Sequence, residues 1–272
     1  WQPVLEYFLP VQMCHMRVNE KYRVWHDYCH LDDARMAPAL NHIDGYTQNA
    51  STLTKYAPGD IVPGLNIGGW HDAGDFDLRV ESQAGESYIL ALAYEAFRED
   101  YDVTSIDHHN RITEIHQLDG KPDLLQQVEN GALTVVGGYR ALGRLYRGII
   151  CNDLRQYVML GDAGAMTDNM IGNADDRWVF TEDNPSRELS TAAALAAVSR
   201  VLKGFNDTLS VQSLQAAREL FDRTHVTDRS EINKLQAAVE LYLATREDGY
   251  KKYILGQQKL IVDNIARTGW FI

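Results

Sequence analysis

Apolar side chains recur with a helical period along most of the chain after residue 84. Within 84–97 (AGESYILALAYEAF), Tyr88, Leu92 and Ala96 are spaced four residues apart and fall on one helix face. Pro122 and Asp123 are typical of the first turn of a helix. The same reasoning predicts further helices over 122–145, 210–225, 230–244 and 249–264. One more helix is predicted to begin at Asn184 or Ser186 and to end near residue 204. No convincing period-2 run is present, so the pattern predicts an all-α chain.

Two segments interrupt the helical pattern, 38–67 and 100–119. The first is rich in Pro, Gly, Asn and Thr, and the second carries three histidines among several charges. Long loops of this kind are uncommon in compact domains and often shape a binding site. A bundle, a solenoid and an α/α toroid all fit successive helices with short connections. Long loops on one rim favour the toroid, where they build a cleft on a rigid scaffold.

Composition narrows the function classes. The chain has 272 residues, a net charge of −12 and no clustered Lys/Arg stripe, which argues against a nucleic acid or an anionic membrane surface as partner. No run of about 18 apolar residues is present to span a bilayer. Three cysteines are too few for a disulfide scaffold. The chain opens at Trp1 and closes on Ile272, and we expect it to be a piece of a longer polypeptide.

The most informative segment is 68–77, GGWHDAGDFD. Asp72 and Asp75 stand three residues apart in a turn of small residues, with aromatic side chains on both sides. Glycines permit backbone angles and close approaches that a side chain would block, so the segment is suited to holding two acids at a fixed geometry. The alternative is that the two acids only cap a helix and bind backbone amides.

Three motifs together resemble glycoside hydrolase family 9, the inverting endoglucanases and their relatives. They are Phe8 with Gln12-Met13-Cys14, the 28–34 segment YCHLDDA, and above all GGWHDAGD at 68–75. The alanine-rich run at 191–196 and the segment 235–253 follow in that family's order. The resemblance covers the whole chain but only about half of such a catalytic domain, and it implies an (α/α)6 barrel, here incomplete, with long rim loops.

The resemblance assigns roles to individual residues. It implies that Asp75 is the general base that activates the attacking water and that Asp72 helps to hold that water. The general acid would be a glutamate in an Asn-Glu context, which we do not find here and expect beyond Ile272. Trp70 and Phe76 are candidates for an aromatic wall against the sugar rings. Arg79 departs from the Gly-Lys-Tyr pattern that familiar members carry, and is a candidate for substrate contact or for an ion pair.

The same resemblance implies a structural zinc site. The matching ligands are Cys14, Cys29, His30 and His71, a Cys₂His₂ set that suits tetrahedral Zn²⁺. A Cys14–Cys29 disulfide in an exported protein and a pair of reduced thiols are the alternatives. Calcium also occurs in the family, but no ligand set for it is assignable here.

The sequence therefore predicts a hydrolase that cleaves β-1,4-linked glucans with inversion, acting on cellulose, mixed-linkage glucan or xyloglucan. A secreted, periplasmic or cell-surface location follows from that substrate, and an accessory domain upstream is compatible with the chain. An exo-acting β-glucosidase or glucosaminidase and a non-catalytic glycan-binding homologue remain alternatives.

Overall fold

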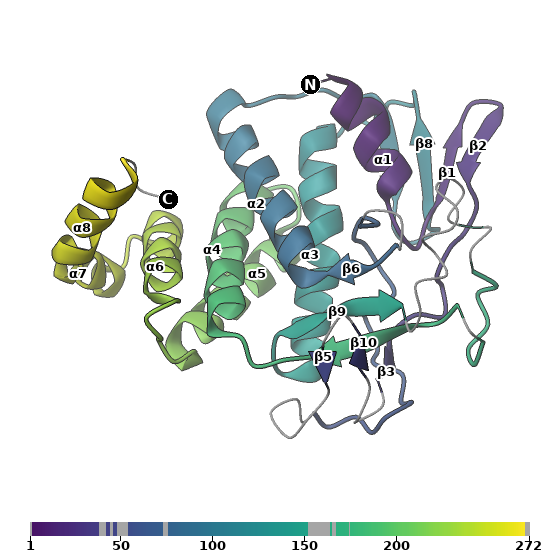
Figure 1. The fold of residues 1–272 in the computed structure, drawn as a ribbon. Coiled ribbons are helices and arrows are strands. Elements are labelled where there is room, and N and C mark those ends of the chain that lie inside the picture. The colour runs from purple at the N-terminus through teal and green to yellow at the C-terminus, as the bar shows by residue number, and fades with distance from the viewer. Residues whose placement is uncertain are drawn as a thin grey trace. The chain divides into compact units, whose positions relative to one another are not determined.

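The computed structural model describes residues 2–37, 42–43, 46–47, 54–72, 76–151, 164, 167–173 and 175–269. The chain forms two compact units, Trp1–Asp183 and Asn184–Ile272 (Figure 1). Among the described residues, no helix has the length and apolar character needed to cross a membrane. This division by packing does not test whether 1–272 is part of a single catalytic domain, which stays a prediction.

The first unit combines two long helices with short strands (Figure 1). Its helices are the π-helical turn η1 (Val4–Phe8), α1 (Leu9–Gln12), α2 (Val80–Phe97) and α3 (Asp123–Leu142). The long helices α2 and α3 pack against each other. Trp70, 2 % exposed, lies in an apolar core with side chains from η1, α1 and α3.

Both long helices predicted in this unit are confirmed, with shifted ends. α2 begins at Val80, four residues before the predicted start at 84, because its first turn follows directly on a strand. α3 ends at Leu142, and Gly143 directly after it has a φ of 70°. A left-handed residue after the last turn is a common helix stop, and glycine adopts it without a Cβ clash.

The first sheet adds short strands that the helical pattern did not predict. Its order is β2-β1-β8-β7, and its strands are β1 (Arg17–Glu20), β2 (Arg23–His26), β7 (Thr104–Asp107) and β8 (Ile112–Ile115). β8 pairs in parallel with β1 and antiparallel with β7, so the segment 100–119 is a hairpin and not only a loop. Each strand has four residues, which is too few for a period-2 pattern to stand out.

The second sheet has the order β3-β10-β9-β6. Its strands are β3 (Arg35–Met36), β6 (Leu78–Arg79), β9 (Tyr146–Cys151) and β10 (Arg177–Thr181). β6 leads without a break into α2, which fixes the end of the acidic motif to the edge of this sheet. Within the predicted 38–67 loop, β4 (His42–Ile43) and β5 (Tyr46–Thr47) pair antiparallel, whereas 38–41, 44–45 and 48–53 lie outside the described residues.

The second unit is helical in its described part. Its helices are α4 (Pro185–Leu202), α5 (Asp207–Arg223), α6 (Glu231–Thr245), α7 (Asp248–Gly256) and α8 (Gln258–Thr268). α4 packs against α5 and α6 through an alanine-rich surface that is almost fully buried. The Asn184 side chain accepts a hydrogen bond of 3.1 Å from the backbone N–H of Arg187, which confirms one of the two predicted caps.

The prediction of one helix over 249–264 is wrong. The segment forms α7 and α8, which meet at Gln257, where φ is −98° and ψ is 19°. Gly256 ends the first of the two helices, and glycine weakens a helix interior because it has more backbone freedom to lose. The hydrophobic period alone does not reveal this break.

Candidate functional site

The first half of the acidic motif, 68–72, is held by hydrogen bonds from the helices behind it. The Gly69 N–H donates to the Asn130 carbonyl of α3 at 2.9 Å. The Gln83 side chain of α2 pairs with the Trp70 backbone in both directions, at 2.8 and 2.9 Å. Cys14 donates its backbone N–H to the Gly69 carbonyl at 2.9 Å. Buried backbone groups of this loop are therefore paired with rigid elements.

Gly68 and Gly69 are required by this packing. Their φ values are +69° and +85°. A Cβ on Gly68 would lie 2.3 Å from the Asn130 carbonyl oxygen, and one on Gly69 would lie 2.4 Å from the Leu78 side chain. No other residue type fits both the angle and the space.

Asp72 lies where the loop closes. Its backbone N–H donates to the Asp77 carbonyl at 2.9 Å, so the two residues form a bridge across the intervening segment. The Ser82 hydroxyl of α2 lies 3.5 Å from the Asp72 carboxylate. Asp75 belongs to 73–75, outside the described residues, and its role as general base stays a prediction.

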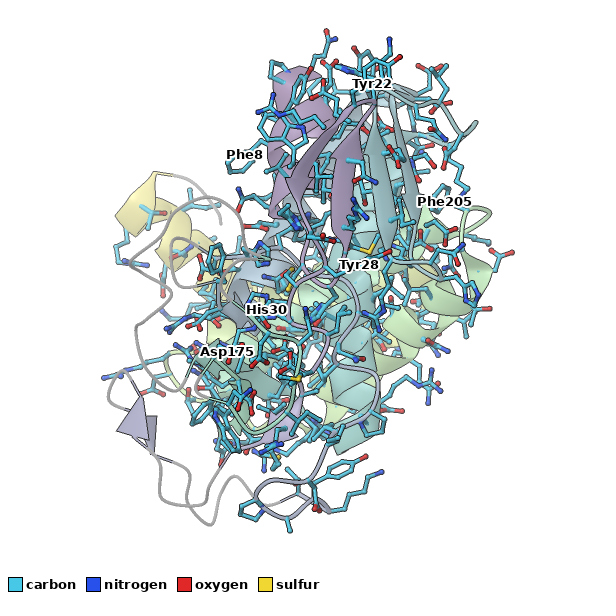
Figure 2. The ribbon with its side chains drawn as sticks, turned by 90° about the vertical axis from the view of Figure 1, so that its right-hand side faces the viewer. Phe8, Tyr22, Tyr28, His30, Asp175 and Phe205 are labelled. Carbon is cyan, nitrogen blue, oxygen red and sulfur yellow. The ribbon has the colours of Figure 1, made fainter. Side chains whose placement is uncertain are left out.

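A cavity of about 320 Å³ opens beside Asp72. Its wall includes Phe8, Gln12, Trp70 and Glu86 together with Asp72. Phe8 is 61 % exposed and projects outward, whereas His30 lies inside the fold (Figure 2). The volume is at the lower end of the range of small-molecule sites, about 300–1,000 Å³. An exposed aromatic ring beside carboxylates suits a sugar, which presents C–H faces and hydroxyl groups.

Glu86 gives this cavity a second described acid. Loss of water around its carboxyl raises the pKa to about 7, and the neighbouring charge of Asp72 adds to the increase, although the residue as a whole is exposed. Glu86 lies on α2 and was not predicted as a site residue, because an acid on an amphipathic helix normally marks the solvated face.

Glu86→Gln is expected to stabilise the protein at neutral and alkaline pH but not at pH 4. The pKa of Glu86 is higher in the folded state than its ordinary 4.5, so wild-type stability falls as pH rises from about 4.5 to 7. Glutamine removes that loss. We expect the melting temperature of Glu86→Gln to equal that of wild type at pH 4. At pH 8 it should exceed wild type by about 2–4 °C, a size that allows for screening by water. An equal difference at both pH values would contradict this.

The structure brings the four predicted metal ligands together. Donor atoms of Cys14, Cys29, His30 and His71 all lie within 4.8 Å of one another, and all four residues are buried. The Cys14 sulfur is 3.7 Å from Nδ1 of His30, and the Cys29 sulfur is 3.5 Å from Nε2 of His71. Both cysteines are free thiols in the structure.

These separations fit one tetrahedral ion. With Zn–S of about 2.3 Å and Zn–N of about 2.0–2.1 Å, a tetrahedral angle places sulfur and nitrogen about 3.6 Å apart. The two measured distances bracket that value. Four ligands also leave no open position, which is typical of a structural site.

The protonation states of three of the four ligands suit a metal ion. Burial alone would raise the pKa of Cys14, but a hydrogen bond with Cys29 and the charge of Arg177 outweigh it and hold the pKa well below its usual value. Burial lowers the pKa of His71 to about 4 and also lowers that of His30. One thiolate and two neutral imidazoles are forms that bind a metal ion. Burial and the hydrogen bond with Cys14 raise the pKa of Cys29 well above its usual value, so the fourth ligand must release its proton when the ion binds.

The aromatic residues that were predicted to contact the sugar rings are more buried than a wall of a substrate cleft would be. Trp70 and Phe76 are 2 % and 4 % exposed. Phe76 packs on both imidazoles of the cluster, 4.9 Å from His71 and 6.0 Å from His30 between ring centroids. Arg79 pairs with Asp77 at 3.0 Å. Sugar contact by these three residues stays a prediction.

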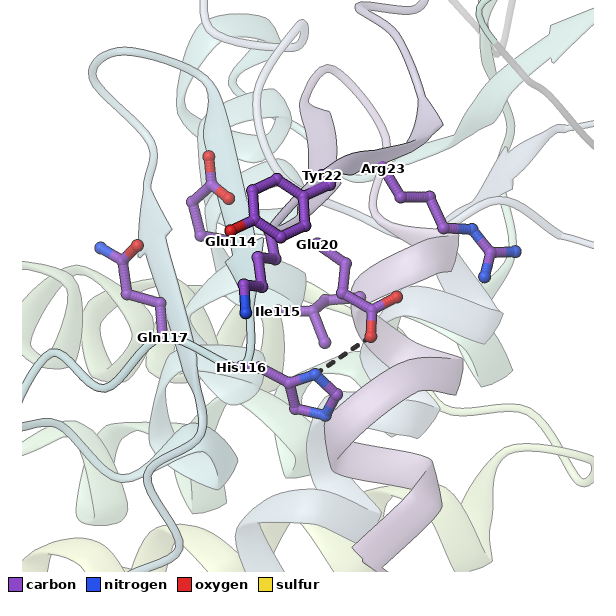
Figure 3. Close-up of a pocket in the computed structure, with 8 residues that line it drawn as sticks. Glu20, Tyr22, Arg23, Glu114, Ile115, His116 and Gln117 are labelled. Carbon is purple, nitrogen blue, oxygen red and sulfur yellow. Dashed lines mark ion pairs between the residues drawn. The ribbon is translucent and has the colours of Figure 1, made fainter.

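A larger cavity of about 640 Å³ lies on the first sheet, away from the motif in sequence (Figure 3). Glu20, Tyr22, Glu114 and His116 are among its lining residues. Nδ1 of His116 pairs with Glu20 at 3.0 Å, and Nε2 of the same ring contacts Glu6. This histidine, from the segment 100–119 that the sequence predicts to be a loop, is held between two carboxylates.

Comparison with known proteins identifies related folds. The sequence model of glycosyl hydrolase family 9 matches residues 5–270. A metagenome-derived glycoside hydrolase family 9 endoglucanase is 19 % identical, with a TM-score of 0.63 over 95 % of this chain and 46 % of its own. An endoglucanase from the termite Nasutitermes takasagoensis is 20 % identical, with a TM-score of 0.61 over 99 % of this chain and 55 % of its own.

A family 9 protein of Bacteroides ovatus is 16 % identical, with a TM-score of 0.63 over 93 % of this chain and 47 % of its own. No curated protein sequence matches the chain significantly. The chain spans about half the length of the solved structures it matches. The likeness confirms the predicted (α/α)6-barrel class, in part of its length and with three small sheets among the described residues.

Proposed function

Because the chain belongs to glycosyl hydrolase family 9, we propose that it forms part of an inverting hydrolase of β-1,4-linked glucans. The observation that carries the proposal is the loop 68–72, which backbone hydrogen bonds hold in place and whose Asp72 lines a cavity beside an exposed aromatic ring. Two of the solved structures that the chain resembles are endoglucanases, which supports the proposal. A location outside the cytoplasm follows from a polymeric glucan substrate.

Inversion requires a base on one face of the sugar and an acid on the other. The two carboxyl groups stand roughly 6.5–9.5 Å apart so that a water molecule fits between the base and the sugar. By the family resemblance, Asp75 activates this water and Asp72 helps to hold it. Two acids three residues apart are too close in the chain to be the opposed pair. The acid glutamate is expected from the part of the family domain that this chain does not span.

The second part of the proposal is a zinc ion held by Cys14, Cys29, His30 and His71. When bound, such an ion would supply a structural cross-link between the N-terminal segment and the motif, with no open position for substrate. His71 directly precedes Asp72 in the sequence, so the ligand fixes the backbone from which Asp72 projects.

The test is hydrolysis by the full-length polypeptide on barley β-glucan, xyloglucan and carboxymethylcellulose. Reducing-sugar release should identify the preferred glucan, and proton NMR of the first products should show the α-anomer that inversion creates. Mixed oligomers would indicate endo action, and monomers alone would favour the exo-acting alternative. Binding without any release would favour a glycan-binding homologue and overturn the hydrolase proposal.

A further inference from the structure

Arg177 lies at the start of β10 and is fully buried, at 0 % exposure. A buried guanidinium needs compensation of its charge and of its N–H donors. Asp33 supplies the charge: Nε of Arg177 donates to one carboxylate oxygen at 3.1 Å, and Nη2 donates to the other. This two-point pairing fixes the plane of the guanidinium.

With its plane fixed, Arg177 reaches two further groups. Nη2 lies 3.0 Å from the sulfur of Cys14, and Nη1 donates to the backbone carbonyl of Phe76. Cys14 belongs to the metal-binding cluster, and Phe76 follows Asp75 directly in the sequence. One side chain thus contacts both the cluster and the end of the acidic motif.

The other end of the motif is held by the same network. Nε2 of His15 pairs with Asp33 at 2.8 Å, and Nδ1 of His15 lies 3.0 Å from the Gly68 carbonyl oxygen. His15 and Asp33 are buried as completely as Arg177. The three side chains therefore connect the Gly68 carbonyl to the Phe76 carbonyl, and the segment between them contains His71, Asp72 and Asp75.

We propose that Arg177 is a positioning residue that couples the metal-binding cluster to the loop carrying Asp72 and Asp75, by binding the Cys14 sulfur and the Phe76 carbonyl while Asp33 holds its plane. The catalytic part of this inference rests on the proposed hydrolase function, whereas the metal part does not. A lysine cannot replace it, because a single ammonium cannot make a two-point pair with Asp33 and still reach both other acceptors.

The test compares Arg177→Lys with wild type in the full-length protein. Removal of a group that hydrogen-bonds to a metal ligand typically lowers metal affinity or activity by about 10–100-fold. We expect zinc affinity, measured by chelator competition, to fall by about that factor. In the cobalt-substituted protein, the thiolate-to-metal charge-transfer band should shift, because the Cys14 sulfur loses a hydrogen bond. The kcat on glucan should fall by about 10–100-fold with little change in KM.

Arg200→Lys is the matched control. Arg200 is another mostly buried arginine, paired with Glu240 at 2.7 Å within the second unit. Its substitution should lower the melting temperature but leave the cobalt spectrum and zinc affinity unchanged. If Arg177→Lys behaves the same way, with only its melting temperature reduced, Arg177 is merely structural and the inference is overturned.

Asp33→Asn provides a second variant if Arg177→Lys does not fold. It keeps the guanidinium but removes the charge that fixes its plane, so the same spectral and affinity changes are expected, and their absence would overturn the coupling. A wild-type protein without glucan hydrolysis would remove the proposed function, yet the metal measurements would still decide whether Arg177 binds the Cys14 ligand.

Discussion

Asp75→Asn is expected to reduce kcat on the preferred soluble glucan by about 10²–10⁴-fold, the usual contribution of a general base. Asparagine keeps the shape of the side chain but cannot accept the proton of the attacking water. Binding of the glucan should persist, because the substitution leaves the size of the side chain nearly unchanged. The measurement is steady-state hydrolysis with separate determination of kcat and KM.

Two further variants make this result specific. Asp72→Asn should lower kcat less than Asp75→Asn, since its carboxylate assists the base without taking the proton. Asp107→Asn removes one carboxylate from the exposed end of β7, where the side chain bonds Asn110 at 2.7 Å, and should leave kcat unchanged. Retention of more than about a tenth of wild-type kcat by Asp75→Asn would contradict its role as base.

The helices were predictable because a helix is encoded by the spacing of apolar residues within a short stretch of sequence. In α2 and α3 the apolar side chains repeat every three to four residues, and the pattern locates the helix although its ends shift by a few residues. The strands were not predictable on these grounds. β8 exists because it pairs with β1, about 95 residues earlier in the sequence, and four residues carry too little pattern of their own.

The candidate site likewise contains residues that local motifs predict and a residue that depends on long-range contacts. The spacing and resemblance of its motif identified Asp72 and the four cluster residues, and the structure brings the latter within 4.8 Å of one another. The partner of Arg177 has no local signal, because Arg177 meets Asp33 across 144 residues of chain. The sequence does show that a charged residue begins the largely apolar segment RWVFT. A buried arginine requires a partner of opposite charge, but the sequence does not say which one.

Removal of one cluster ligand gives the second large expected effect. Cys29→Ser should abolish stoichiometric zinc binding and lower the melting temperature by about 8–16 °C in zinc-containing buffer. A ligand present at 1,000 times its dissociation constant stabilises the folded state by about 4.1 kcal/mol. In a protein of this size each kcal/mol corresponds to about 2–4 °C. Elemental analysis and thermal unfolding, with and without a strong chelator, measure the two quantities.

Cys151→Ser is the control for this result, because it makes the same chemical change outside the predicted ligand set. It should retain one zinc per chain and lose stability only on chelation, as wild type does. Thiol titration after unfolding tests for the disulfide: a zinc site or a pair of reduced thiols yields three reactive thiols per wild-type chain, whereas a Cys14–Cys29 disulfide yields one. Both cysteines of the pair are buried, so a disulfide would also make wild-type stability insensitive to the chelator. That outcome would contradict the zinc site while leaving the assignment of Asp75 open to its own test.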